Sequence, residues 1–423
     1  MKVWGSGAAG LAWIFLACTA TIVGAQTLPS EPIEFGAGHV TVGGDVSATF
    51  SCATPIDASC GEDAGFFNYT DYAHSALRLF RVDVSAAVKA GPHFTVLSQV
   101  RSENLDTAEP YALYLRVRPW SSKDFDIQVG LVPPTFGAFL RHSYANDNPL
   151  IGYPLAYQYL TTLRPDALPA SADELLKKRS TGWLVKYSVG DSTAQAGVPL
   201  VTAFSWDTGV QAHGTVGIVS ATAAITTGTI SHPLFKEDND GRQLATRVEL
   251  RPVMGLVVGT SFAHGAFVSQ SAARAAVGSE ANDQSYAQTA WGGDLEYSHG
   301  YYLLRAETIV SSWRLPTATP PAAQVPIQDA LTSFSTSVEG RYKLRPRLYV
   351  AARFDRLTFS DLAGADGISQ PWDAPVKRIE VGTGYSLQRN LVLKLSYQHN
   401  TRDGGNFLPR VGKFAAAQLV YWF

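Results

Sequence analysis

Apolar and polar residues alternate along most of this chain. Leu391, Leu393 and Leu395 occupy every second position of one segment, while Lys394 and Ser396 fall on the other face. Because a strand points successive side chains to opposite faces, this period of two predicts a β-strand with one apolar and one polar face. The same period recurs in four other segments, at residues 111–118, 244–251, 348–355 and 378–385.

Two architectures share this alternation: a soluble antiparallel sandwich, and a membrane barrel whose apolar face contacts lipid and whose polar face lines the lumen. Three features favour the barrel. Strands span about ten residues, turns alternate between very short and long, and aromatic residues lie near strand ends. We therefore predict an all-β fold, a transmembrane antiparallel up-and-down β-barrel with short periplasmic turns and long extracellular loops.

The number of strands follows from the tight turns. Eight hairpins, a first strand near 38–50 and a last strand near 412–423 make 18 strands, an even number as this class requires. The hairpin around Gly190 has a second strand with poor alternation, and without it the count is 16. The tight turns lie at residues 90–93, 121–123, 190–192, near 216, 252–254, 299–300, 345–347 and 388–390, and the long loops at 51–73, 102–110, 132–180, 229–241, 269–286, 314–331, 360–374 and 401–411.

The last nine residues read AAAQLVYWF. Leu419, Tyr421 and Phe423 share one face of a strand that ends in an aromatic cluster. A closed barrel has no free edge, so we expect this strand to pair with the first one. A terminal phenylalanine with apolar residues at alternate positions also resembles the recognition signal of outer-membrane barrels.

Residues 1–25 have the pattern of a secretory signal peptide. The apolar stretch from Leu11 to Val23 is followed by Val23-Gly24-Ala25, a small-x-small cleavage site. A lipoprotein signal ending at Cys18 is the alternative. We expect residues 26–423 to form a single barrel domain in the bacterial outer membrane.

Cys52 and Cys60 would remain after cleavage, on either side of a polar seven-residue gap. In an exported chain such a pair predicts a disulfide that closes a small loop. A metal site would need more ligands than this stretch supplies. We predict no metal and no cofactor.

Composition and motifs exclude several functions. The formal net charge is −2 and 17% of residues are charged, so we expect no nucleic-acid partner, and the short run Lys177–Arg179 is interpreted as a solvated loop face. The motifs GxSxG, GxxxxGK[ST], HExxH and CxxC do not occur. We therefore predict that the protein is not an enzyme.

The polar faces of the predicted strands carry bases with acids interleaved. One interpretation is a water-filled channel whose charges bias which solutes pass. The other is a wall of cross-strand ion pairs that only stabilises the barrel, and both can be true. The candidate pore-lining residues are Arg101, Arg116, Arg118, Arg247, Glu249, Arg251, Arg305, Glu307, Arg341, Lys343, Arg353, Asp355, Arg378, Glu380 and Lys394.

The longest loop, residues 132–180, is unusually apolar and aromatic for a surface loop. Loops of this length usually have a function. Folded into the lumen, which would otherwise be aqueous, it would narrow the pore; alternatively it packs over the barrel mouth or against a neighbouring subunit. The candidates for the constriction are Arg141, His142, Tyr144, Tyr157 and Arg164.

Three stretches make the chain similar to the outer-membrane porins, and most similar to the phosphate-selective porin O/P type. They are IQVGLVPPTFG at Ile127–Gly137, WDTGVQAHGTVG at Trp206–Gly217 and RIEVGTGYSLQRNLVLKLSYQHN at Arg378–Asn400. The resemblance implies passive diffusion of small anions through 16-stranded barrels that commonly form trimers. It assigns no phosphate-binding ladder of arginines and lysines to residues of this chain.

We therefore expect a porin that admits small hydrophilic solutes or ions by passive diffusion, with anion preference as one option. A structural or adhesion barrel with a blocked lumen is the second hypothesis. An outer-membrane enzyme is the third, and it would need a serine, a histidine and an acid that converge near one rim. The expected partners are outer-membrane lipid, small hydrophilic solutes or anions, and, from the resemblance, further copies of the chain in a homotrimer.

Overall fold

The computed structural model describes Pro29 and residues 31–54, 80–104, 107–203, 206–279, 281–404 and 411–423. Sixteen antiparallel strands form a closed ring. They are β2 (Val40–Thr54), β3 (Phe80–Ala90), β4 (Phe94–Glu103), β5 (Glu109–Val117), β6 (Phe125–Val132), β9 (Asp207–Val216), β10 (Val219–Thr226), β11 (Gln243–Leu250), β12 (Leu256–Ala266), β13 (Ala287–His299), β14 (Tyr302–Trp313), β15 (Leu331–Arg345), β16 (Leu348–Phe359), β19 (Val376–Gln388), β20 (Leu391–Arg402) and β21 (Val411–Trp422).

The remaining elements lie outside this ring or in its loops. They are β1 (Ile33–Phe35), β7 (Ala167–Leu168), β8 (Val189–Gly190), β17 (Asp361–Ala363), β18 (Ser369–Pro371), the α-helices α2 (Leu155–Gln158), α3 (Ala172–Lys177) and α4 (Gln270–Val277), and the short 3₁₀ helices η2 (Phe139–His142) and η3 (Asp283–Ser285). In the ranges described, no helix combines the length and the apolar character needed to cross a membrane.

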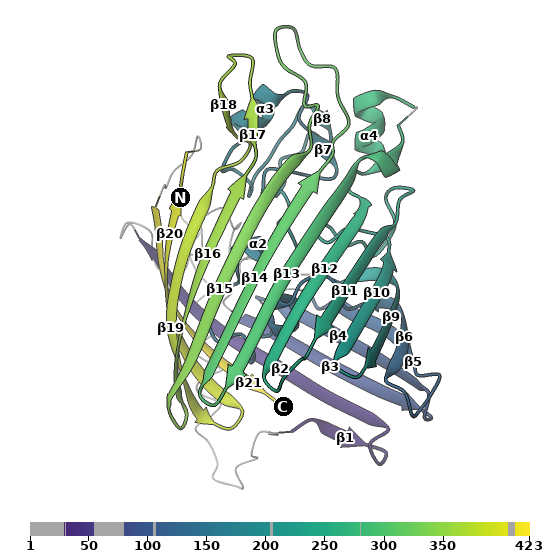
Figure 1. The fold of residues 1–423 in the computed structure, drawn as a ribbon, viewed down its shortest axis with the longest axis vertical. Coiled ribbons are helices and arrows are strands. Elements are labelled where there is room, and N and C mark those ends of the chain that lie inside the picture. The colour runs from purple at the N-terminus through teal and green to yellow at the C-terminus, as the bar shows by residue number, and fades with distance from the viewer. Residues whose placement is uncertain are drawn as a thin grey trace, which may run out of the picture.

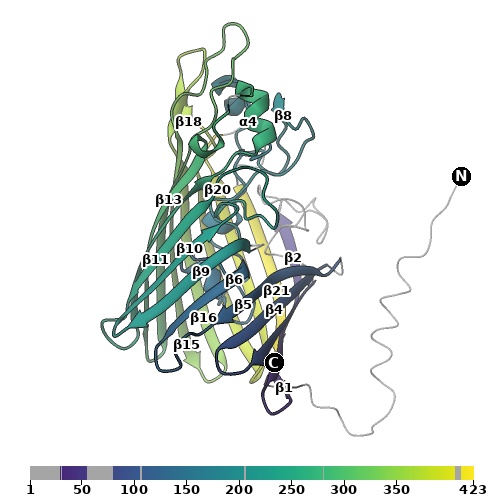
Figure 2. The same cartoon turned by 90° about the vertical axis from the view of Figure 1, so that its right-hand side faces the viewer.

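The two ends of the barrel differ (Figures 1 and 2). One end carries α3, α4, β8 and β18, and the other carries β1, the C-terminus and the short turns that join strands of the wall. Short turns face the periplasm in bacterial outer-membrane barrels. We therefore call these the extracellular and periplasmic ends.

The barrel closes because the last strand pairs with the first, as the sequence predicts. β21 runs antiparallel to β2 from the pair Asp45 and Trp422 to the pair Thr54 and Lys413. Beyond that register, Gly44 and Phe423 exchange two backbone hydrogen bonds of 3.0 Å each. The ladder therefore continues to the final residue, and no strand edge is left for lipid to meet.

The burial pattern of the strands is the inverse of a soluble sandwich. On β20 the apolar Leu395 and Tyr397 are 49% and 43% exposed, whereas Lys394 and Gln398 are 2% and 1% exposed. The apolar face of the strand therefore points outward and its polar face points into the barrel, as the membrane-barrel interpretation requires.

The prediction of 18 strands is wrong, and the alternative of 16 is confirmed. The expected hairpin around Gly190 is not part of the wall, because β8 pairs with β7 in a separate two-stranded sheet. β6 and β9 are hydrogen-bonded neighbours, so residues 133–206 form one long connection between them. The tight turn at residues 190–192 led to this prediction, but Val185 and Tyr187 before it are buried in a hydrophobic core rather than exposed to lipid.

This hydrophobic core lies inside the extracellular half of the barrel. Trp313 at the end of β14 and Trp372 in the loop before β19 are fully buried, with ring centroids 6.1 Å apart. Phe359 packs against Trp372 at 4.7 Å, and the long connection contributes to the same core. Packed side chains therefore occupy space that the sequence analysis expected to be aqueous.

Two predictions concern residues that the structure does not describe in full. Residues 1–25 and Cys60 lie outside the described ranges. The signal peptide and the disulfide between Cys52 and Cys60 therefore stay predictions.

Replacing Gly44 at the closing seam should destabilise the barrel. A Cβ atom there would lie 2.7 Å from a ring carbon of Phe423 and 3.3 Å from the carbonyl oxygen of Asp83. A valine should therefore displace the terminal ring, at about 1–3 kcal/mol for overpacking. Gly293 on β13 is the matched control, because a Cβ atom there has no described heavy atom within 4 Å.

Urea unfolding in detergent micelles, followed by tryptophan fluorescence, measures the difference. The free energy of unfolding should be lower for Gly44→Val than for Gly293→Val. Equal values for the two variants would contradict the proposed packing at the seam.

Candidate functional site: the lumen and its inserted loop

The connection between β6 and β9, residues 133–206, enters the barrel, and we call it the inserted loop. Pro133 and Pro134 follow β6 directly and have no backbone N–H for a strand ladder, which favours the end of the strand at this point. The chain then forms η2 and α2, and Figure 1 shows α2 within the outline of the barrel.

Glu307 on β14 holds the first part of the inserted loop. The backbone N–H of Ala138 donates to its carboxylate at 2.6 Å. The hydroxyl of Tyr157 donates to the same carboxylate at 2.8 Å. Burial and this neighbouring negative charge raise the pKa of Tyr157 well above its usual value, so the phenol keeps the proton that it donates.

Strands β19 and β20 hold the middle of the inserted loop. Glu380 accepts a hydrogen bond of 2.9 Å from the backbone N–H of Gly152, and Lys394 donates to the carbonyl oxygens of Ala145 and Asn148. Gly152 is required by the close approach, since a Cβ atom there would lie 2.2 Å from the amide nitrogen of Gln398. The buried ammonium and carboxylate groups thus bind the backbone of the loop.

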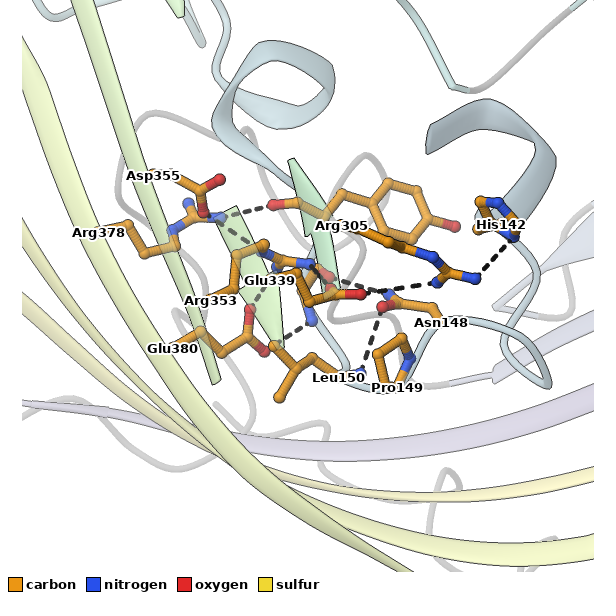
Figure 3. A network of polar contacts seen from close by, with 12 residues as sticks. His142, Asn148, Pro149, Leu150, Arg305, Glu339, Arg353, Asp355, Arg378 and Glu380 are labelled. Carbon is orange, nitrogen blue, oxygen red and sulfur yellow. Dashed lines mark hydrogen bonds and ion pairs between the residues drawn. The ribbon is translucent and has the colours of Figure 1, made fainter. Parts of the chain in front are cut away.

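A belt of ion pairs continues from these contacts along the wall (Figure 3). Arg353 on β16 lies between Glu339 on β15 at 3.2 Å and Glu380 on β19, and also pairs with Asp355 at 3.3 Å. Arg378 donates to the carbonyl oxygen of Tyr153 at 2.8 Å. The acids and bases of this belt are almost completely buried, so each charge depends on its partners.

A second part of the belt lies on β11 and β13. Arg247 forms a bidentate pair with Asp294 at 2.6 and 2.8 Å, and its Nε lies 2.9 Å from Glu249. Arg141 from the inserted loop also pairs with Glu249. Glu249 therefore joins the wall to the loop, and the Arg141 side chain remains 42% exposed.

His142 forms a cluster with two acids, Asp147 and Glu296, and one base, Arg305. Its Nε2 lies 3.3 Å from Glu296, its Nδ1 contacts Asp147, and Arg305 Nη2 lies 3.0 Å from the same Nδ1. Burial lowers the pKa of His142, but hydrogen bonds to Asp147 and Glu296 outweigh this effect and raise it overall. Nδ1 can donate to Asp147 or accept from Arg305, and the two carboxylates favour the protonated ring.

The opposite wall carries a smaller cluster on β3, β4 and β5. Arg101 pairs with Asp83 at 2.7 Å, and its guanidinium carbon lies 3.7 Å from the ring centroid of Tyr111. Tyr144 from the inserted loop donates to Gln99 at 2.9 Å. Burial raises the pKa of Tyr144, so its hydroxyl stays protonated.

The structure separates the pore-lining candidates into two groups. Arg305 is intermediate between them, with 17% of its side chain exposed. The charges packed against the inserted loop or within the belt are Arg101, Arg247, Glu249, Glu307, Arg353, Asp355, Arg378, Glu380 and Lys394. The remaining charges are partly or fully exposed and lie at or near the periplasmic ends of β5, β11 and β15; they are Arg116, Arg118, Arg251, Arg341 and Lys343.

The constriction candidates also differ in position. Arg141 and His142 face water in part, and Tyr144 is half-buried. Tyr157 and Arg164 are buried. Arg164 binds Asp166 and the carbonyl oxygens of Val185 and Thr193, so it stabilises the loop itself.

Three acidic residues of the lumen, Asp147, Asp294 and Glu296, were not predicted from the sequence. Asp294 and Glu296 alternate with Leu295 and Tyr297 on β13, so the period of two could have identified them. Asp147 lies in the inserted loop, where no period exists.

In the ranges described, no group of three or more His, Cys, Asp or Glu side chains is placed to hold a metal ion.

No family model and no curated protein matches the chain. Its fold is similar to OmpF of Salmonella typhi, solved as a complex with daunomycin, at 13% identity over 92% of this chain and 100% of that chain, with a TM-score of 0.56. An anion-selective porin from Comamonas acidovorans is 10% identical over 91% of this chain and 99% of that chain, with a TM-score of 0.54. OmpT of Vibrio cholerae is 11% identical over 94% of this chain and 100% of that chain, with a TM-score of 0.52.

These identities show the fold alone. The shared fold is that of outer-membrane β-barrel proteins, in agreement with the expected location in the bacterial outer membrane. The similarity extends to porins as a class and does not single out the phosphate-selective O/P type.

Replacing Lys394 should loosen the inserted loop. Methionine would leave the buried carbonyl oxygens of Ala145 and Asn148 without their donor, which should cost about 2–4 kcal/mol. Lys377→Met is the matched control, because Lys377 is exposed on the outer face of neighbouring β19. Urea unfolding and limited proteolysis should both distinguish the variants, and a Lys394→Met protein as stable and as resistant as the control would contradict the tethering role.

Replacing His142 tests the charge of its cluster. The pKa of His142 is raised in the folded protein. Protonated His142 therefore stabilises the fold at pH values below the ordinary pKa of histidine, and this contribution is lost as the pH rises through the raised pKa. The pKa of Asp147 is lowered by the hydrogen bond and charge of His142 against the effect of burial, so its contribution is lost only at acid pH. The stability difference between wild type and His142→Gln should be largest near about pH 5–6.

That difference should shrink toward about pH 9, and it should not exceed about 1 kcal/mol because the cluster is partly exposed. Thermal unfolding across this pH range measures it. His264→Gln on the outer face of β12 is the control. A difference that does not change with pH, or that matches the control, would contradict the charge assignment.

Proposed function

We propose that the protein is a porin through which small hydrophilic solutes and ions diffuse passively, with a preference for small anions. The observation that carries the anion preference is a set of cations on the lumen face nearer the periplasmic end. Arg116, Arg341 and Lys343 have no carboxylate within ion-pair distance in the described part of the chain. Unpaired cations in a narrow aqueous passage attract anions and repel cations.

The cross-strand neighbours of these cations are neutral. Arg116 stands opposite Gln128 and Thr95. Lys343 stands opposite Tyr349, and the Arg341 guanidinium lies 5.8 Å from the centroid of the same ring. None of these three cations is described in an ion pair, whereas the charges of the buried belt nearer the middle of the barrel are paired with its acids.

The ion pairs of the belt argue against selectivity for phosphate in particular. Arg247, Arg305 and Arg353 each pair with carboxylates, so they do not form a purely basic ladder. We therefore restrict the proposal to small anions as a class and do not extend it to phosphate. OmpT of Vibrio cholerae is described in a trimer form, and we propose a homotrimer for this chain by analogy of fold alone.

A barrel with a blocked lumen is the second candidate. The hydrophobic core around Trp313 and Trp372 favours it, because packed loops occupy the extracellular half of the barrel. Measurable ion current supports the porin proposal, and its absence supports the blocked barrel.

Ion selectivity in planar bilayers tests the anion preference. The reversal potential in a KCl gradient should indicate anion preference for the wild type. Arg341→Gln/Lys343→Gln should lower the anion-to-cation permeability ratio by about twofold or more. Lys236→Gln, exposed in the loop between β10 and β11, is the control and should leave the ratio unchanged.

Two results would contradict the proposal at different points. No current above background would defeat passive diffusion itself. A cation preference, or an unchanged ratio in the double variant, would defeat the anion preference alone.

A further inference from the structure

An apolar hollow of about 950 Å³ lies on the outer wall of the barrel, over strands β13 to β20. Its outward-facing side chains are exposed although they are large and apolar. Exposed apolar surface of this extent marks a contact with lipid or with another molecule. The lining includes Tyr297, Leu304, Val350, Val381, Leu395 and Tyr397.

Two small residues lie side by side in the lining of the hollow. Gly340 on β15 and Ala352 on β16 are cross-strand partners, and both face outward. Larger side chains flank them in the same row, Leu304 on β14 and Val381 on β19. A Cβ atom on Gly340 would meet no described heavy atom within 4 Å. The result is a notch two strands wide between the bulkier side chains of Leu304 and Val381.

The turn at the periplasmic end of the notch is basic. Arg345 ends β15, Arg347 lies in the turn between β15 and β16, and both are exposed. Neither has a carboxylate within ion-pair distance in the described ranges, whereas Arg389 in the next turn pairs with Glu31 at 2.9 Å. Arg345 and Arg347 therefore leave unpaired positive charge at a turn that adjoins the notch.

Tyrosines complete the boundary between the notch and water. Tyr302 and Tyr342 lie on adjacent strands with ring centroids 4.7 Å apart, and Tyr301 in the preceding turn is 65% exposed. Tyrosine rings favour the level of lipid headgroups, where one end is apolar and the other is wet. The height of these rings indicates that the headgroup layer meets the wall at the turn, with the notch in the hydrocarbon.

We propose that an anionic phospholipid of the periplasmic leaflet docks at this place, with an acyl chain in the notch and its phosphate at Arg345 and Arg347. The charge is complementary, and basic residues at a membrane surface select anionic headgroups. A flexible acyl chain fits a notch two strands wide, which the broad wall of a second barrel would bridge without filling. This inference does not depend on passage through the lumen.

Native mass spectrometry of the full chain in detergent tests the proposal, with phosphatidylglycerol and phosphatidylcholine added in parallel. The wild type should retain phosphatidylglycerol with about a fivefold preference. Arg345→Gln/Arg347→Gln should reduce this preference to near unity. Ala352→Phe should fill the notch and reduce retention of both lipids, while Ala223→Phe, an outward-facing alanine on β10, should retain them as the wild type does.

Three outcomes would overturn the proposal. The first is equal retention of the two lipids by the wild type. The second is equal retention by Ala352→Phe and Ala223→Phe. The third is a loss of oligomers in Ala352→Phe alone, which would assign the hollow to contact with a second copy of the chain.

Discussion

The structure depends on the complete pairing of backbone polar groups around the wall. Hydrocarbon offers no hydrogen bonds, so a sheet in a membrane must leave no free edge. The bonds between Gly44 and Phe423 extend the closing seam to the last residue. Once the ring is closed, the period of two places every second side chain in the interior, and this interior has to accommodate a large number of charges.

The inserted loop is the means by which those charges are satisfied. A buried charge is tolerated when it is paired and hydrogen-bonded. Lys394 and Glu380 satisfy part of this requirement with the loop backbone, and Arg353 satisfies it with acids of the wall. The buried charges therefore fix the loop, while the unpaired cations nearer the periplasmic end are the groups that we propose attract anions. One face of each strand thus serves both stability and the proposed passage.

Local pattern predicted the wall better than the interior. The strand positions followed from alternation, and the pairing of the last strand with the first followed from closure. The hairpin around Gly190 was wrong because a tight turn also occurs inside the inserted loop, where Val185 and Tyr187 are buried in a core instead of facing lipid. The contact between Lys394 and Ala145 could not be predicted, since its partners are distant in sequence and the loop has no period.

The most direct test of this account is the accessibility of successive side chains on β16 in a lipid bilayer. Spin labels at single cysteines from Val350 to Asp355, in a cysteine-free background, report contact with oxygen in lipid and with a water-soluble nickel complex. The account predicts high oxygen contact at Val350, Ala352 and Phe354, and low contact with both reagents at the inward-facing positions between them. High oxygen contact at Ala351, Arg353 and Asp355 instead, or equal contact at all six positions, would contradict it.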